Sequence, residues 1–156
     1  MSVVQIQYAQ NNEFKSKKCG YSWDDSVPNL GGGLEVLKLS IDPVNRNNKL
    51  LVQASIHVVE ETNTSDHIIV ALFKDNDLGA VATAVEEVYE DYSQYGGLTT
   101  TVNLTHVLDL EHQRPVTLTI EVGLSGEGKI NINGGAGSRK LGGSLHSTLV
   151  VTEFTP

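Results

Sequence analysis

The feature that most constrains the fold is the alternating pattern that closes the chain between Gly134 and Phe154. A glycine-rich turn and the pair Gly142–Gly143 lead into a run with apolar residues at every second position. This period of two, with β-branched residues, predicts a strand. We expect it to lie inside a sheet, because a slip of one residue would turn its apolar side chains towards water. The predicted faces are Leu145, Ser147, Leu149 and Val151 on one side and His146, Thr148, Val150 and Thr152 on the other.

Short alternating or apolar runs, separated by turn residues, fill the rest of the chain. Turn chemistry is concentrated around Pro28, around Asp42 and in the segment Ser125–Gly128. The run His67–Lys74 is almost continuously apolar, so we expect its strand to be covered on both faces or by a neighbouring subunit. Strands are predicted at residues 4–8, 34–41, 49–59, 67–74, 98–108, 116–124 and 129–133, with a brief second strand at Tyr21 and Trp23.

Residues 79–92 fit two patterns. Val81, Val85, Val88 and Tyr92 recur at helical spacing, and the alanines and glutamates of this segment favour a helix. The alternation of small and β-branched residues from 80 to 85 fits a strand equally well. The residues alone leave both possibilities open.

Three segments carry a resemblance to small virion proteins encoded by bacteriophages. They are the closing GSRKLGGSLHSTLVVTEF, the earlier DDSVPNLGGGLEVLKLSIDPVNRNNKLLVQ and the central VALFKDNDLGAVATAV. The resemblance implies a jelly roll like that of tumour necrosis factor and the complement globular head, often a homotrimer on a virion surface. It also favours a strand ending near Val85 over a helix. Its motifs are turns and strands that carry no catalytic or ligand-binding residues, so the resemblance is more informative about the fold than about the function.

We therefore predict an all-β fold: an antiparallel jelly-roll sandwich of about eight to ten strands that forms trimers. A single jelly-roll domain is expected over residues 1–156, with residues 1–23 as a first strand plus a polar arm. A chain of 156 residues is long enough to bury a substantial core.

The charge balance limits the possible partners. With 11 basic and 19 acidic residues the net charge is −8, which argues against binding nucleic acid or anionic membranes. The longest apolar run, Leu50–Val59, is too short to span a bilayer, so no membrane insertion is expected. No signal-peptide pattern is seen at the N-terminus. We expect a protein made in the host cytoplasm and located on the virion surface.

Catalytic and metal chemistry find little support in the residues. Ser125 lies between glycines, but one position out of the Gly-x-Ser-x-Gly pattern of hydrolases. The histidines are not spaced as zinc ligands, although His106 or His146 could meet its copies on a threefold axis. The acidic segments 86–91 and 75–77 lack the spacing of a calcium loop. The single cysteine, Cys19, excludes an internal disulfide. We predict no catalytic residue, metal or cofactor.

Two clusters are candidate partner-binding residues. Lys15, Lys17 and Lys18 lie in a polar stretch over residues 11–20, which reads either as a solvated loop or as an arm for an acidic partner. The second cluster lies in a predicted acidic loop and consists of Tyr89, Tyr92 and Tyr95. Tyrosine is common in recognition surfaces, but these rings could also plug the end of the sandwich.

Three functions from different classes are open at this point. The resemblance favours a non-enzymatic structural protein of the phage virion, either capsid decoration or cement or a head or tail knob, in contact with other virion proteins. The alternative is the receptor- or carbohydrate-binding tip of a tail fibre, or a soluble module that binds a host surface glycan. The third is an enzyme, which no residue pattern supports.

Overall fold

The computed structural model describes residues 1–61, 66–88, 98–126 and 128–156. Its described strands are β1 (Ser2–Asn11), β2 (Lys15–Lys17), β3 (Leu34–Ile41), β4 (Lys49–Glu60), β5 (Asp66–Lys74), β6 (Ala82–Val88), β7 (Leu98–Asp109), β8 (Val116–Leu124), β9 (Ile130–Ile132), β10 (Gly134–Gly135), β11 (Ser138–Arg139) and β12 (Ser147–Thr155). A 3₁₀ turn, η2 (Leu141–Gly143), precedes β12. The ambiguous segment 79–92 thus contains a strand, as the resemblance favoured, and it extends three residues beyond Val85.

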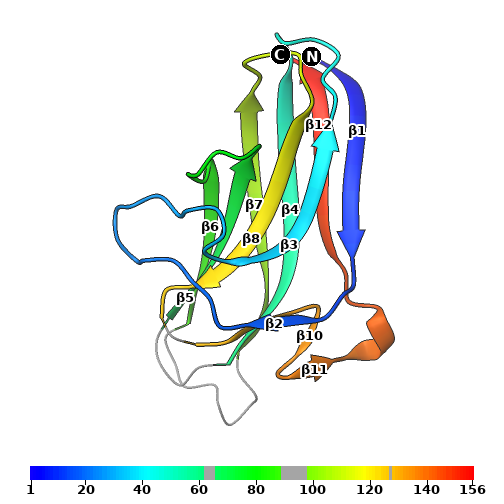
Figure 1. The fold of residues 1–156 in the computed structure, drawn as a ribbon. Coiled ribbons are helices and arrows are strands. Elements are labelled where there is room, and N and C mark those ends of the chain that lie inside the picture. The colour runs from blue at the N-terminus through cyan, green and yellow to red at the C-terminus, as the bar shows by residue number, and fades with distance from the viewer. Residues whose placement is uncertain (62–65, 89–97, 127) are drawn as a thin grey trace.

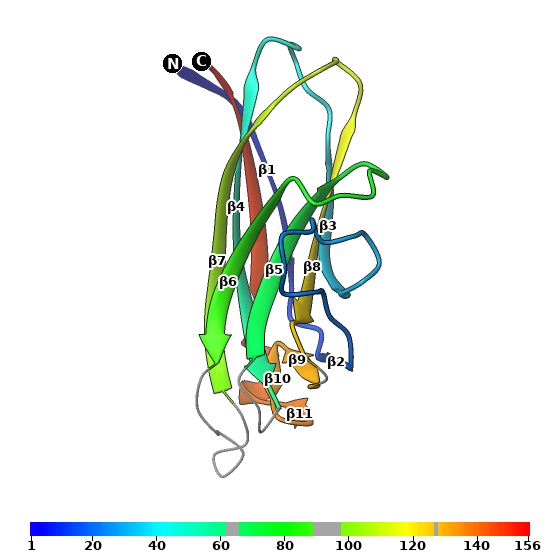
Figure 2. The same ribbon diagram turned by 90° about the vertical axis from the view of Figure 1, so that its left-hand side faces the viewer.

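Two antiparallel sheets form a sandwich (Figures 1 and 2). The first sheet runs β1-β12-β4, with β7 on the other edge of β4 and β9 extending the edge that β12 occupies. The second sheet runs β3-β8-β5-β6. Strands that follow each other along the chain cross repeatedly between the sheets. This order is that of a jelly roll, and it confirms the predicted fold class.

The core lies between the sheets because inward positions along each strand are apolar at every second residue. Fully buried large side chains come from both sheets: Ile41, Leu50, Ile56, Ile68, Leu72, Leu118, Ile120, Leu124, Ile130, Ile132 and Leu149. Phe73 is also fully buried, but it belongs to a second, smaller cluster outside the sandwich.

The closing strand lies inside the first sheet, as predicted, but it begins at Ser147, so Leu145 and His146 precede it. β12 pairs with β1 on one edge and with β4 on the other. Ser147, Leu149 and Val151 are buried, whereas Thr148 and Val150 on the other face are half-exposed. The two termini lie side by side at one end of the sandwich (Figure 1).

The predicted brief strand at Tyr21 and Trp23 is wrong. These residues belong to an irregular stretch, residues 20–33, which we call the cover loop. It crosses the outer face of the second sheet, where Tyr21 and Leu30 pack on Ile69, Ala71 and Phe73. The apolar strand β5 is therefore covered on both faces by its own chain, so its composition gives no reason to place a second subunit there.

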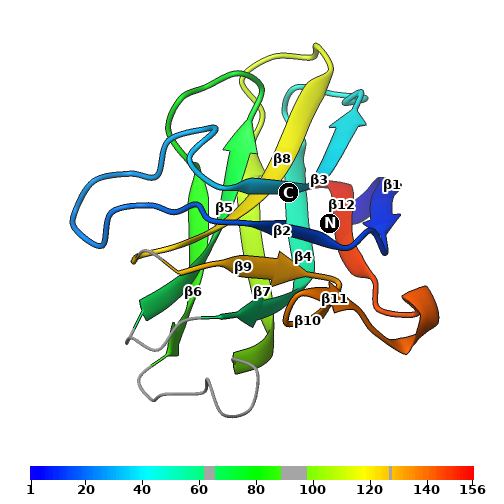
Figure 3. The ribbon, with the colours of Figure 1, turned by 60° about the horizontal axis from the view of Figure 1, so that its bottom comes forward.

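The polar stretch over residues 11–20 is not a free loop throughout. Lys15–Lys17 forms β2, which pairs with β9. The two strands lie side by side across one end of the sandwich (Figure 3), and β2 is at the end opposite the termini (Figure 1). The first 23 residues thus hold two strands rather than one strand and an arm.

Candidate binding site on the cover loop

A buried carboxylate holds the cover loop against the second sheet. Glu121 points outwards from β8 and is only 4% exposed. Its Oε1 accepts a hydrogen bond from Tyr21 Oη at 2.8 Å and its Oε2 accepts one from the Gly31 backbone N–H at 2.9 Å. The Gly33 N–H also donates to it at 3.2 Å. The glycine run over residues 31–33 therefore binds a carboxylate of its own chain.

Two of these glycines are required by local geometry. Gly31 has a φ of 92°, in the left-handed region that other residues rarely adopt. A Cβ at Gly33 would lie 2.4 Å from Tyr21 Oη, inside contact distance. The backbone can approach Glu121 only because both side chains are absent.

The rest of the cover loop is attached through backbone contacts. Tyr21 N donates to Leu124 O at 2.9 Å, and Leu30 N donates to Leu78 O at 2.8 Å. Ala80 N donates to Pro28 O at 3.0 Å. The loop is therefore fixed to β8 on one side and to the turn before β6 on the other.

Trp23, the one tryptophan of the chain, lies on the imidazole of His67 at the start of β5. The ring centroids are 3.5 Å apart and the planes differ by 7°. The side chain is nevertheless 58% exposed. Since stacking covers one face only, the other face of the indole is open to solvent.

His67 is itself contacted by Ser125, which follows β8, and by Glu87 of β6. Its Nδ1 lies 3.2 Å from Ser125 Oγ, and its backbone N–H donates to the same oxygen at 2.8 Å. Its Nε2 lies 3.8 Å from Glu87 Oε1. Ser125 thus contacts a histidine whose other ring nitrogen faces a carboxylate, an arrangement that sequence spacing did not reveal. In a Ser–His–Asp triad the serine contacts Nε2 and the acid contacts Nδ1, the reverse of this order. We assign these contacts to the positioning of His67 beneath Trp23.

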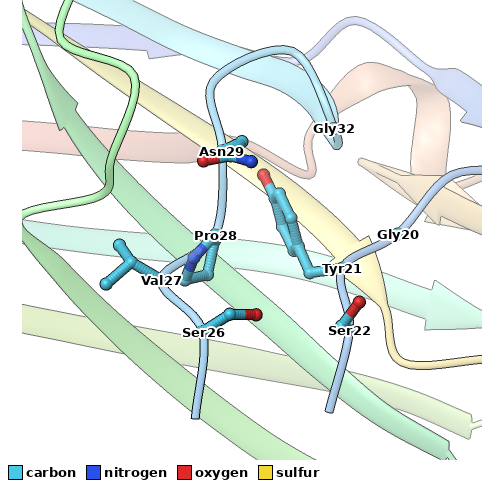
Figure 4. Close-up of a pocket in the computed structure, with 8 residues that line it drawn as sticks. All are labelled: Gly20, Tyr21, Ser22, Ser26, Val27, Pro28, Asn29 and Gly32. Carbon is cyan, nitrogen blue, oxygen red and sulfur yellow. The ribbon is translucent and has the colours of Figure 1, made fainter. Parts of the chain in front are cut away.

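Three adjacent pockets surround the cover loop, and Ser26 and Pro28 line all of them. The first, of about 220 Å³, lies between residues 20–22 and 26–32 (Figure 4). The second, of about 260 Å³, adds Asp24, Asp25 and Thr83 to its lining. The third, of about 100 Å³, lies beside Trp23 over β5 and β6.

Asp24 supplies a carboxylate acceptor at this site. Its Oδ1 accepts hydrogen bonds from the hydroxyl of Ser26 and from the Ser26 backbone N–H, the latter at 2.8 Å. These bonds lower the pKa of Asp24, so it is ionised at neutral pH. Among the residues that the structure describes, none that lines the three pockets is Lys or Arg. The site therefore offers a ligand one aromatic face, several hydroxyl groups and anionic hydrogen-bond acceptors.

The predicted lysine cluster is divided by the structure. Lys15 Nζ donates to the Glu35 carbonyl at 3.2 Å and lies 3.9 Å from Glu13. Lys17 and Lys18 are exposed at the end of the sandwich where β2 lies. Of the three lysines in this cluster, only Lys17 and Lys18 present their charge outwards without an ion pair to a described residue.

The predicted tyrosine cluster, Tyr89, Tyr92 and Tyr95, lies outside the described residues. Among the described residues, no group of three or more His, Cys, Asp or Glu side chains is placed to hold a metal ion. His146 Nδ1 is close to the Ser144 carbonyl at 3.1 Å, and His57 Nδ1 to Thr101 Oγ1 at 2.9 Å. Cys19 is half-buried, and burial raises the pKa of its thiol.

The outer face of the first sheet has no counterpart of the cover loop in the described chain. Three of its apolar side chains are clearly exposed, Ile6, Tyr8 and Val107. We call this the uncovered face. Its central rows of paired residues are Ile6, Thr152, Leu51 and Val107; Tyr8, Val150, Gln53 and Thr105; and Gln10, Thr148, Ser55 and Asn103. None of these twelve is Asp, Glu, Lys or Arg, although the chain carries a net charge of −8.

Sequence reasoning identified neither Trp23 nor Glu121 as a site residue. The signals were present: a single tryptophan flanked by Ser22 and Asp24, and a glutamate within the apolar strand Val116–Leu124. A charged residue at a strand position covered by a glycine-rich loop is worth testing as a loop anchor.

The chain is a jelly-roll protein, and comparison with solved structures agrees with this class. Eiger TNF from S. frugiperda aligns over 96% of this chain and 92% of its own, with a TM-score of 0.51 and 8% identity. A CBM35 from Cellvibrio japonicus Abf62 aligns over 93% of this chain and 96% of its own (TM-score 0.42, 13% identity). A structure of the infectious bursal disease virus Gx strain aligns over 97% of this chain and 38% of its own (TM-score 0.41, 14% identity). At 8% identity the likeness to Eiger TNF shows the fold alone, and the two likenesses with TM-scores below 0.5 carry no argument.

No protein-family model matches the sequence, and no curated protein matches it either. Within the described ranges, the structure contains no helix of the length and apolar character needed to cross a membrane.

Proposed function

We propose that this protein is a non-enzymatic structural component of a phage virion surface, a trimeric jelly roll that decorates the capsid or forms a head or tail knob. The phage setting comes from the sequence resemblance. The fold supports it at the coarser level, since a compact sandwich is a rigid unit that can be placed on a particle.

The observation that supports self-association is the difference between the two outer faces, and the number of three chains comes from the resemblance. The cover loop shields one face, whereas the uncovered face presents exposed Ile6, Tyr8 and Val107 across uncharged rows. Exposed apolar patches of this kind mark interaction surfaces. A second copy is the occupant that fits best, because the uncharged central rows do not repel one another in a strongly acidic protein.

The exposed lysines give the proposal a second contact. Lys17 and Lys18 lie at the end opposite the termini, so they can meet an acidic surface on another virion protein. Exposed charges of this kind act mainly on the rate and the salt dependence of association.

Two measurements test the proposal. Light scattering at micromolar concentration should give the mass of three chains, and a stable monomer would contradict the trimer. Imaging of gold-labelled protein on intact particles should place the label on capsid faces or on a head or tail knob. Label found only at fibre tips would favour the receptor-binding alternative.

A further inference from the structure

The open face of Trp23 is a pre-formed platform. A large aromatic ring in a loop usually loses conformational freedom when a ligand binds. Here the stack on His67 has already fixed the ring, and Ser125 and Glu87 fix His67 in turn. A ring that is 58% exposed and yet held on one face can receive a flat apolar surface without rearrangement.

The pockets beside this platform supply polar groups that suit hydroxyl ligands. Ser22, Ser26 and Thr83 offer hydroxyl groups that both donate and accept. In the described structure the hydrogen bonds of Asp24 fall on Oδ1, which leaves Oδ2 to accept from a ligand. Asp25 adds a second carboxylate. Carboxylates accept strongly from hydroxyl donors because the bond is charge-assisted.

We infer that this site on the cover loop binds a neutral glycan, with one sugar ring on the open face of Trp23 and its hydroxyl groups directed to Asp24 and the neighbouring serines. A pyranose ring combines an apolar face of C–H groups with an edge of hydroxyls, and the site combines the same two kinds of surface. The acidic lining excludes uronic, sialic and phosphorylated sugars, because none of the described lining residues is Lys or Arg to pair with an anion.

The position of the site leaves it accessible in an assembly. It lies on the outer face of the second sheet, whereas the uncovered face belongs to the first sheet on the other side of the sandwich (Figure 2). The inference goes beyond the proposed structural role and requires neither the trimer nor the virion. Glycan binding by the isolated protein can therefore fail or succeed independently of that role.

The experiment uses the fluorescence of Trp23, which is the single tryptophan and so reports on the site alone. The purified protein is titrated with neutral gluco-, galacto- and manno-oligosaccharides and, separately, with oligogalacturonate. We expect a saturable change with at least one neutral series at up to about 10 mM, and none with the acidic one. No change with any neutral series, or a tighter response to oligogalacturonate, would overturn the inference.

Two variants and a control locate the binding by calorimetry. Trp23→Ala should weaken binding by about tenfold or more, the loss expected when an aromatic anchor is truncated. Asp24→Asn alters only an exposed side chain and should weaken binding several-fold while leaving the thermal melt unchanged. Tyr8→Ala removes a comparably exposed ring from the uncovered face and should bind as the parent does. If Trp23→Ala and Asp24→Asn bound the glycan as tightly as the parent and Tyr8→Ala do, the glycan would bind elsewhere and the site would be refuted.

Discussion

Tyr21 donates its phenol hydrogen to Glu121 across 2.8 Å, although the two residues are 100 positions apart in the chain. Burial, together with this hydrogen bond, raises the pKa of Tyr21 far above its ordinary value, so the phenol stays protonated and remains a donor. The pair joins the cover loop to the second sheet.

Tyr21→Phe should therefore lower the free energy of unfolding by about 1.5–3 kcal/mol, the range for a hydrogen bond to a charged group. Urea melts measure the loss. The matched control is Tyr8→Phe, which removes a hydroxyl from a ring that is 70% exposed and should change stability by less than about 0.5 kcal/mol. Equal effects of the two changes would mean that Tyr21 does not anchor the loop.

Glu153 of β12 plays a comparable role near the end of the sandwich where the two termini lie (Figure 1). Its buried carboxylate accepts from Gln5 Nε2 at 2.6 Å, from Asn48 Nδ2 at 2.7 Å and from Val44 N at 2.9 Å. Burial raises the pKa of Glu153, but these bonds together outweigh burial and lower it.

A lowered pKa in the folded state gives stability that is present above the unfolded pKa and lost as pH falls through the folded one. The free energy of unfolding should thus decline below about pH 4.3, the ordinary glutamate value. Glu153→Gln should be less stable than the parent by about 1.5–3 kcal/mol at neutral pH. The difference should shrink on acidification in melts at a series of pH values. A constant difference would mean that the ionised form is not the one stabilised.

Leu149 tests the packing of the closing strand. It is fully buried between the sheets, so Leu149→Ala should cost about 2–5 kcal/mol in denaturant melts. Val150→Ala alters the next residue, which is half-exposed on the other face, and should cost less than about 1 kcal/mol. A small effect at Leu149 would place the strand at an edge.

Gln53→Glu tests the uncovered face. Gln53 is exposed in the middle of the uncharged rows, so the change would bring like charges together in any assembly built on this face. Light scattering should report a shift towards monomer, while Asn76→Glu, which adds the same charge in an exposed turn, should keep the parent mass. An unchanged mass for Gln53→Glu would move the interface elsewhere.

The exposed Lys17 and Lys18 lead to a test of attachment. Replacing Lys17 and Lys18 with glutamate should weaken co-sedimentation with undecorated particles, most clearly at low salt, where charges are least screened. Lys15→Glu is the comparison, since its amine already contacts Glu35 of its own chain. Replacing Tyr89, Tyr92 and Tyr95 with alanine should leave attachment intact. Loss of attachment in the tyrosine variant alone would mean that the tyrosine segment, and not the lysine end, faces the particle.

How much the sequence could predict depended on the range of each interaction. The strands Leu34–Ile41 and Val116–Leu124 have the bounds that their patterns predicted, because alternation is a local property. The cover loop could not be placed in this way, since Glu121 and His67, which hold it, are remote in sequence. Tyr21 and Trp23 are two positions apart, a spacing that is typical of a strand. Trp23 is instead held by stacking on His67 of β5.

The pairing of the first strand with the last governs how the chain can be built. In the first sheet β1 pairs with β12, and Ser2 lies opposite Thr155. β1 must therefore wait, with its edges open, until β12 has been made. Contacts of such long range form slowly, and unpaired strands are prone to aggregate meanwhile. This sheet is consequently completed only after β12 has been made, and expression at lower temperature or with a chaperone should raise the soluble yield.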